Sequence, residues 1–227
     1  MFHLRHATVE DAEALRLVIE ASLGDVVDVA RLTDLLAQGR QTLVVYEALS
    51  GQIVGFCDGF RTQDAEGKGR WEVDLIGVHP SWQGRGLARR LLAEQLKIAL
   101  ASNVQQARAL IAEQNSASQK AFRAQGFIPD AERVVLCLLS GYALEWQALA
   151  RVVPVTTLTY TGNWLETISM DRLAQALMDA PKTQDNMLVG AVIPESALVT
   201  HVHLQDLLQV LGQYQWWRYA WSVEAKD

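Results

Sequence analysis

The sequence predicts an α/β protein, because strand-like and helix-like segments alternate along the chain. Residues 72–78 combine alternating acidic and apolar side chains with an apolar end, which is typical of a strand. Residues 87–101 carry leucine and alanine at helical spacing. Hydrophobic residues make up 50% of the 227-residue chain, which is enough to fill a proper core.

Composition limits the classes of partner and compartment. The formal net charge of −6 argues against nucleic acid as a partner, because phosphate contacts require a basic surface. No apolar run has membrane-spanning length and the polar start is no signal peptide, so we expect a cytoplasmic protein without a membrane partner. Cys57 and Cys137 are interpreted as buried free thiols, with a disulfide as the alternative. The five histidines form no ligand set, so no metal is expected.

The first part of the chain is expected to hold two helices and three neighbouring antiparallel strands before its long helix. Thr8 can cap a helix that ends near Ser22, and Gly39 stops a second helix. Ser50-Gly51 is a hairpin signal. The expected elements, in order, are a strand at 2–6, helices at 8–22 and 28–38, strands at 42–48, 52–63 and 72–78, a helix at 87–101 and a strand at 108–112.

A glycine-containing loop, Q-G-R-G-L-A at 83–88, joins the strand at 72–78 to the following helix. The first N–H groups of a helix lack intrahelical partners and lie at the positive end of its dipole, so a phosphate can bind there. Gly84 and Gly86 let the backbone turn and approach a ligand closely. The segment therefore predicts an anion site, with an ordinary glycine turn as the alternative.

The details of this loop separate three kinds of phosphate loop. A Walker loop would need Gly-Lys-Ser/Thr, and a dinucleotide loop would need glycine or alanine at Arg89. What remains is Gln/Arg-x-x-Gly-x-Gly/Ala behind a strand that ends in Val-x-Pro. The residues that fill this pattern are Val78, Pro80, Gln83, Gly86 and Ala88. It resembles the acetyl-CoA loop of the GNAT superfamily of acyl-CoA-dependent N-acetyltransferases.

A second pattern of the same superfamily follows after one helix and one strand. It consists of asparagine, a small residue three positions later, tyrosine or phenylalanine four after that, and then Gly-Phe. Asn115, Ser118, Phe122, Gly126 and Phe127 match it. A capped helix that ends at glycine is common by itself, but the two patterns together make residues 1–140 resemble a GNAT domain.

The resemblance implies a mixed, mostly antiparallel sheet flanked by helices, in which the strands at 72–78 and 108–112 splay apart to admit the pantetheine arm. It implies transfer of an acetyl group from acetyl-CoA, as co-substrate, to a primary amine of a small molecule, peptide or protein by direct attack. The implied cofactor-binding residues are Ile76, Gly77 and Val78 on the strand, Gln83, Gly84, Arg85, Gly86, Leu87 and Ala88 in the loop, and Asn115 and Phe122 in the second pattern.

The chemistry calls for a base, because only a neutral amine can attack a thioester. A lysine-like amine has a pKa of about 10.4 and is almost entirely protonated at pH 7. Glu72 and Asp74 are two positions apart, so a regular strand turns both to one face. The superfamily often places its base on this strand. Glu72 is the first candidate and Asp74 the second; the alternative is a pair of solvated or ion-paired carboxylates.

The chain departs from the family pattern at Phe122. Many GNAT members have tyrosine here, and its hydroxyl is assigned as the acid for the leaving thiolate. Two interpretations stay open. One is a working enzyme in which solvent, or Tyr142 if the fold brings it near, protonates the thiolate. The other is a non-catalytic acyl-CoA-binding sensor. The intact cofactor loop favours the enzyme.

Beyond residue 140 the resemblance ends. We expect a GNAT domain at 1–140, a linker at 141–154 and a small C-terminal α/β extension at 155–227. The expected elements of the extension are strands at 155–160, 165–168, 187–193 and 216–223 and helices at 170–180 and 204–211. Leucine-rich segments at 173–177 and 207–211 indicate a repeat or a coincidence. The aromatic residues at 216–221 form the extension's own core, or a face that packs on the GNAT domain or on a second subunit of a homodimer.

Overall fold

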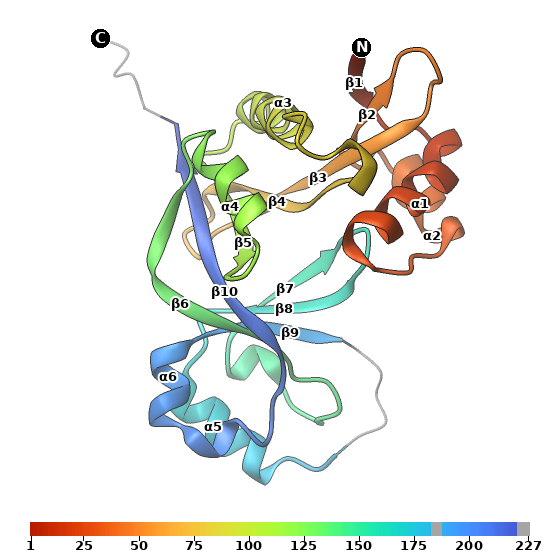
Figure 1. The fold of residues 1–227 in the computed structure, drawn as a ribbon. Helices are drawn as coiled ribbons and strands as arrows, with labels where there is room; N and C mark the ends of the chain where they lie inside the picture. The colour runs from red at the N-terminus through yellow and green to blue at the C-terminus, as the bar shows by residue number, and fades with distance from the viewer. Residues whose placement is uncertain (183–187, 222–227) are drawn as a thin grey trace. The chain divides into compact units, whose positions relative to one another are not determined.

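The structure is a computed structural model that describes residues 1–182 and 188–221 (Figure 1). It divides into two compact units. Among the described residues, the first comprises 1–109, 116–128 and 217–221, and the second comprises 110–115, 129–182 and 188–216. The chain therefore passes between the two units more than once and returns to the first at Trp217.

The first unit is a sheet with helices on both faces. Its strands are neighbours in the order β1-β2-β3-β4-β5; the pairs from β1 to β4 are antiparallel, and β4 pairs with β5 in parallel. The elements are β1 (Phe2–His6), α1 (Ala12–Leu23), α2 (Val29–Ala37), β2 (Leu43–Glu47), β3 (Ile53–Gln63), β4 (Gly69–Val78), α3 (Leu87–Ala101), β5 (Gln106–Ala112) and α4 (Ser116–Arg123).

Helices α1 and α3 cover opposite faces of this sheet (Figure 1). A Cβ atom at Gly59 of β3 would lie 2.4 Å from Nε2 of Gln95 in α3. Gly77 of β4 pairs with Phe56, and a Cβ there would lie 2.3 Å from Oγ of Ser22 in α1. Residues 56 and 59 point to opposite faces of a strand, so the two helices sandwich β3 and β4, and each buries its apolar stripe against them.

The second unit contains most of the strands after α4. Its elements are β6 (Ile128–Leu138), β7 (Arg151–Thr156), β8 (Thr161–Glu166), α5 (Met170–Asp179), β9 (Val189–Pro194), α6 (Glu195–Thr200) and β10 (Gln209–Ala220), whose last residues, from Trp217, belong to the first unit. The strand order is β5-β10-β6-β9-β8-β7, with β8 and β9 parallel across the α5 connection. Its core joins Cys137, Leu165, Leu173, Ile193 and Leu204. Figure 1 shows α5 and α6 on one side of these strands.

Strand β10 gives the chain an arrangement that its order of elements does not suggest. It lies between β5 and β6 in hydrogen-bonding order, so residues 139–208 are inserted before the last strand rather than appended. In the first unit, the guanidinium of Arg123 lies 5.3 Å from the Trp217 ring centroid, and the Tyr219 and Phe127 rings are 5.5 Å apart. Trp217 and Tyr219 thus pack in the unit that holds the glycine loop. The boundaries of the two compact units differ from the expected 1–140, 141–154 and 155–227.

Local expectations succeed in the first unit and fail at specific places in the second. The helix expected at 204–211 is wrong: a 3₁₀ turn ends at Leu204 and β10 begins at Gln209. Leu204 and Leu208 are buried at helical spacing, but sheet pairing from Gln209 overrides that local period. Because residues 207–211 do not form a helix, the leucine-rich segments at 173–177 and 207–211 are not two copies of a helical repeat. Pro154, the last residue of the expected linker, lies inside β7, which is last in the strand order, where proline is tolerated. The expected strands at 187–193 and 216–223 extend beyond the described residues.

The cysteines behave as expected, and both are free and buried. Burial raises the pKa of the Cys137 thiol to about 11. Burial is also the largest cause of the raised pKa of Cys57, followed by the negative charges of Asp58 and Asp74. None of the helices in residues 1–182 and 188–221 is long and apolar enough to cross a membrane.

Candidate functional site

The loop between β4 and α3 has the geometry of an anion site. Gly84 and Gly86 adopt left-handed φ values of +75° and +72°, which favour glycine, and apart from the adjoining backbone and chain neighbours no described atom lies within 4 Å of a Cβ built at either position. Leu87 then starts α3 and is buried, which fixes the helix start. The side-chain amide of Gln83 donates to the Val78 carbonyl at 3.0 Å and ties the loop to the end of β4.

Strand β4 changes its pairing halfway along. Its ladder with β5 consists of Arg70–Glu72 against Gln106–Arg108 and ends there, although β4 continues to Val78. On its other side, Cys57 pairs with Ile76 and Gly59 pairs with Val73. Asp58 therefore faces two residues, Asp74 and Leu75, which form a β-bulge. Bulges reorient side chains and backbone groups and are common beside active sites.

A buried carboxylate stands opposite this bulge. Asp58 has no exposed surface and accepts hydrogen bonds from Nε of Arg40 at 3.0 Å and from the Thr42 hydroxyl at 2.7 Å. The guanidinium of Arg40 also lies 4.5 Å from the Phe60 ring centroid. Because a buried charge must be paired and hydrogen-bonded, Asp58 fastens the segment before β2 to the part of β3 that faces the bulge.

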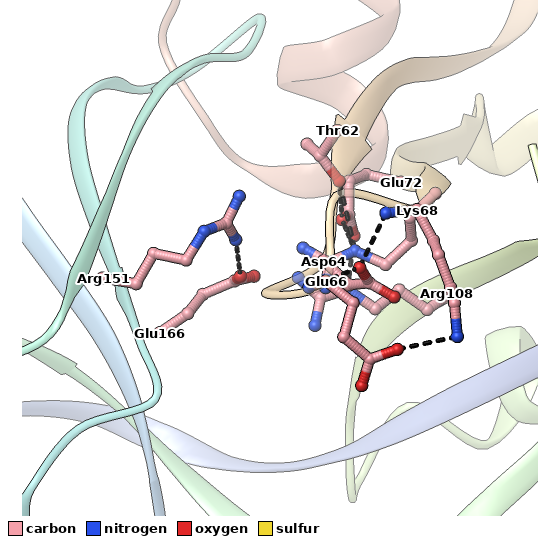
Figure 2. A network of polar contacts seen from close by, with 9 residues as sticks. Thr62, Asp64, Glu66, Lys68, Glu72, Arg108, Arg151 and Glu166 are labelled. Atoms are coloured by element: carbon pink, nitrogen blue, oxygen red, sulfur yellow. Dashed lines mark hydrogen bonds and ion pairs between the residues drawn. The ribbon is translucent and has the colours of Figure 1, made fainter.

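Glu72 lies among charged side chains at the point where the β4–β5 ladder ends. Its Oε1 accepts from the Thr62 hydroxyl at 2.6 Å and from Nε of Arg70 at 2.7 Å, and its Oε2 accepts from Nε of Arg108 at 2.7 Å. Figure 2 shows the labelled residues Thr62, Glu72 and Arg108 from β3, β4 and β5 in this cluster. Arg70, Glu72 and Arg108 are all buried.

All the residues predicted as a site except Asn115 belong to the first unit. Ile76, Gly77 and Val78 lead from the bulge through the 3₁₀ turn Pro80–Trp82 to the loop 83–88 at the start of α3. Phe122, in the same unit, is buried with its ring centroid 4.9 Å from that of Phe127. Asn115 belongs to the second unit. Tyr142 is also in the second unit, where its hydroxyl donates to the Leu207 carbonyl at 2.9 Å.

Three features of the site were not predicted from the sequence: the bulge, the Asp58 pair and the arginines around Glu72. A faint signal existed for two of them. The alternation of acidic and apolar residues breaks at Leu75-Ile76, at the end of the bulge, and Arg70 and Glu72 stand at the strand spacing that gives one face. No group of three or more residues that could hold a metal occurs within the described ranges.

Comparison with family models identifies the family of the chain, and comparison with solved structures supports its fold. The sequence matches the model of the Acetyltransferase (GNAT) family over residues 13–127, about half of the chain. A search of curated proteins gave no match. A solved structure from Pyrococcus horikoshii, assigned as an acetyltransferase, has a TM-score of 0.61 at 15% identity and covers 98% of this chain and 90% of its own. The NatC complex bound to Gag peptide and CoA has a TM-score of 0.52 at 15% identity, covering 58% of this chain and 87% of that one. The predicted family and α/β fold class are confirmed.

Proposed function

The chain belongs to the GNAT acetyltransferase family, and on this premise we propose that it transfers an acetyl group from acetyl-CoA to a primary amine. The observation that carries the proposal is the loop 83–88. Two glycines with left-handed φ stand directly before α3, and the space beside each is open. The pyrophosphate of acetyl-CoA is a group that such a helix start binds.

The pantetheine arm is proposed to follow the edge of β4 beyond the end of its ladder with β5. Ile76, Gly77 and Val78 pair with β3 on one side, and the β5 ladder has ended four residues earlier, at Glu72. A strand edge offers N–H and C=O groups to an extended ligand that carries amides, as pantetheine does. Asn115 and Phe122 are proposed as further cofactor contacts through the second family pattern.

Asp74 is the better-supported base of the two carboxylates. It stands on the bulge and is half-buried, next to the segment proposed for the pantetheine arm. Glu72 already accepts three hydrogen bonds from its neighbours, so taking a proton from an amine would disturb them. A backbone N–H displaced by the bulge is a candidate to polarise the thioester carbonyl.

The acceptor is proposed as a primary amine of a small molecule, peptide or protein. The NatC complex, which is similar in fold, was solved with CoA and Gag peptide, and this supports including peptides. A cytoplasmic location accords with two buried free thiols, and light scattering would test the proposed homodimer.

A second candidate function, acyl-CoA sensing without turnover, is favoured by one observation. Phe122 has no hydroxyl to protonate the leaving thiolate, and Tyr142 already donates its hydroxyl to Leu207 in the second unit. We favour catalysis, because a thiolate is a good leaving group that solvent can protonate.

Calorimetry with acetyl-CoA, followed by a thiol-release assay with small amines, lysine peptides and peptides with free N-termini, tests both candidates. We expect acetyl-CoA to bind and at least one amine class to release CoA. Binding without turnover of any acceptor would favour the sensor, and no binding of acetyl-CoA would overturn the proposal.

A further inference from the structure

The cluster around Glu72 joins three strands through one carboxylate. Thr62 belongs to β3, Arg70 and Glu72 to β4, and Arg108 to β5. Both carboxylate oxygens of Glu72 are used, Oε1 by Thr62 and Arg70 and Oε2 by Arg108. The Nε of Arg70 also lies 3.1 Å from the Thr62 hydroxyl, which closes a small ring of hydrogen bonds.

The cluster lies at one particular place in the sheet, the end of the ladder between β4 and β5. Glu72 and Arg108 are the last residue pair of the parallel ladder between β4 and β5. One residue beyond Val73 comes the bulge at Asp74 and Leu75, and then the segment Ile76–Val78. The ion pair thus lies where β4 and β5 cease to be held together by backbone hydrogen bonds.

We propose that Glu72 is a positioning residue that clasps β3, β4 and β5 at the end of the β4–β5 ladder and so sets the opening that receives the acetyl-CoA arm. The proposal rests on the proposed function for its ligand. The geometry favours a clasp over a base, because both oxygens are engaged and the paired side chains are buried. Removing one member of a buried, hydrogen-bonded charge set leaves its partners without compensation, so the strands there should lose their fixed spacing.

Figure 2 also shows a contrasting pair on the turn that leads into β4. The Nζ of Lys68 lies 2.7 Å from a carboxylate oxygen of Glu66, but the two side chains are 51% and 70% exposed. An exposed pair of this kind contributes little, since water already solvates both charges. Glu66→Gln is therefore a matched control: it makes the same chemical change a few residues away and should leave acetyl-CoA binding unchanged.

A double-mutant cycle with Glu72→Gln and Arg108→Gln tests the clasp. Each single variant should raise the dissociation constant for acetyl-CoA by about tenfold, equivalent to about 1.4 kcal/mol. The double variant should be little worse than either single one, because both remove the same interaction. Folding should be weakened with the same non-additive pattern. In the pH–rate profile, the fall of kcat at low pH should remain in Glu72→Gln, because the base is another group.

Thr62→Val keeps both ion pairs and removes only the two hydrogen bonds of the Thr62 hydroxyl, so it tests the clasp if the charge variants fail to fold. A smaller rise in the dissociation constant is expected. Two results would overturn the proposal. One is a Glu72→Gln variant with unchanged acetyl-CoA affinity. This holds whether the variant loses kcat together with the low-pH decline of its pH–rate profile or loses only folding stability. The other is additive effects of the two charge variants on unfolding. The unfolding cycle needs no acetyl-CoA, so the clasp can be tested even if the proposed function fails.

Discussion

The two halves of strand β4 are built in different ways. From Arg70 to Val73 the strand is buried; it pairs with both β3 and β5 as far as Glu72, and an ion-pair cluster holds it there. From Asp74 to Val78 it begins with a bulge, includes three half-buried residues and pairs with β3 beyond the bulge. One strand thus contains a fixed half and an open-edged half.

The difference indicates which half of β4 serves ligand binding and which half stabilises the fold. Buried charges in the fixed half need all their partners and allow little movement. The open-edged half extends beyond the ladder with β5, where the ligand is proposed to lie, and leads through the 3₁₀ turn Pro80–Trp82 to the glycine loop. Substitutions at Asp74 and in the glycine loop should therefore change ligand binding or turnover, whereas those in the fixed half should change stability as well.

The largest effect is expected from Gly86→Glu in the loop that follows the open-edged half. A side chain there fills the space beside the helix start, and its charge repels pyrophosphate. Measurable acetyl-CoA binding should disappear in calorimetry while the protein stays folded.

Gly51→Glu provides the matched control, because Gly51 has a similar φ of +71° and equally open space but lies in the turn between β2 and β3. It should suffer the same backbone strain and bind acetyl-CoA normally. If Gly86→Glu bound acetyl-CoA as well as Gly51→Glu, the loop would not be the pyrophosphate site.

A smaller, purely kinetic effect is expected from Asp74→Asn at the bulge. If Asp74 accepts the amine's proton, kcat should fall by about 100-fold, the lower end of general-base contributions. The decline of kcat at low pH should vanish, because the group that had to be deprotonated is gone. Acetyl-CoA affinity, measured separately, should stay near that of the parent protein. A folded variant with unaltered kcat would exclude Asp74 and point to ordered water as the proton's route.

The smallest of the three effects is a stability change from Gly77→Ala, which tests how tightly the end of β4 packs. The new Cβ would lie 2.3 Å from the Ser22 hydroxyl and 2.5 Å from the Phe56 ring. We expect the free energy of unfolding to fall by about 1–3 kcal/mol, as is usual for overpacked sites. Adding Ser22→Ala should recover part of the loss in denaturant titrations. An unchanged free energy of unfolding in Gly77→Ala would show that the neighbouring side chains shift at little cost to accommodate the new Cβ.

Much of the first unit could be predicted because its signals are local. Thr8, Gly39, Ser50-Gly51 and Gly126 mark helix and turn boundaries whatever the rest of the chain does. The glycine loop could be identified for the same reason: a left-handed backbone before a helix requires residues of one kind at fixed spacing.

The remaining features depend on pairing between distant segments. Neither the partner of Glu72 on β5 nor the residue opposite the bulge can be read from β4 alone, since Arg108 and Asp58 are 36 and 16 positions away from Glu72 and Asp74 respectively. The same reason applies to β10: its place between β5 and β6 follows from sheet pairing, and the helical spacing of Leu204 and Leu208 pointed the other way.

Amide hydrogen exchange with and without acetyl-CoA tests the division of β4 most directly. The account predicts that amides of Arg70–Glu72 are protected in the free protein and change little when acetyl-CoA is added. Amides of Ile76–Val78 and of the first turn of α3 should exchange faster in the free protein and become protected on binding. Protection that rose equally along the whole of β4, or that left both Ile76–Val78 and the start of α3 unchanged, would contradict the account.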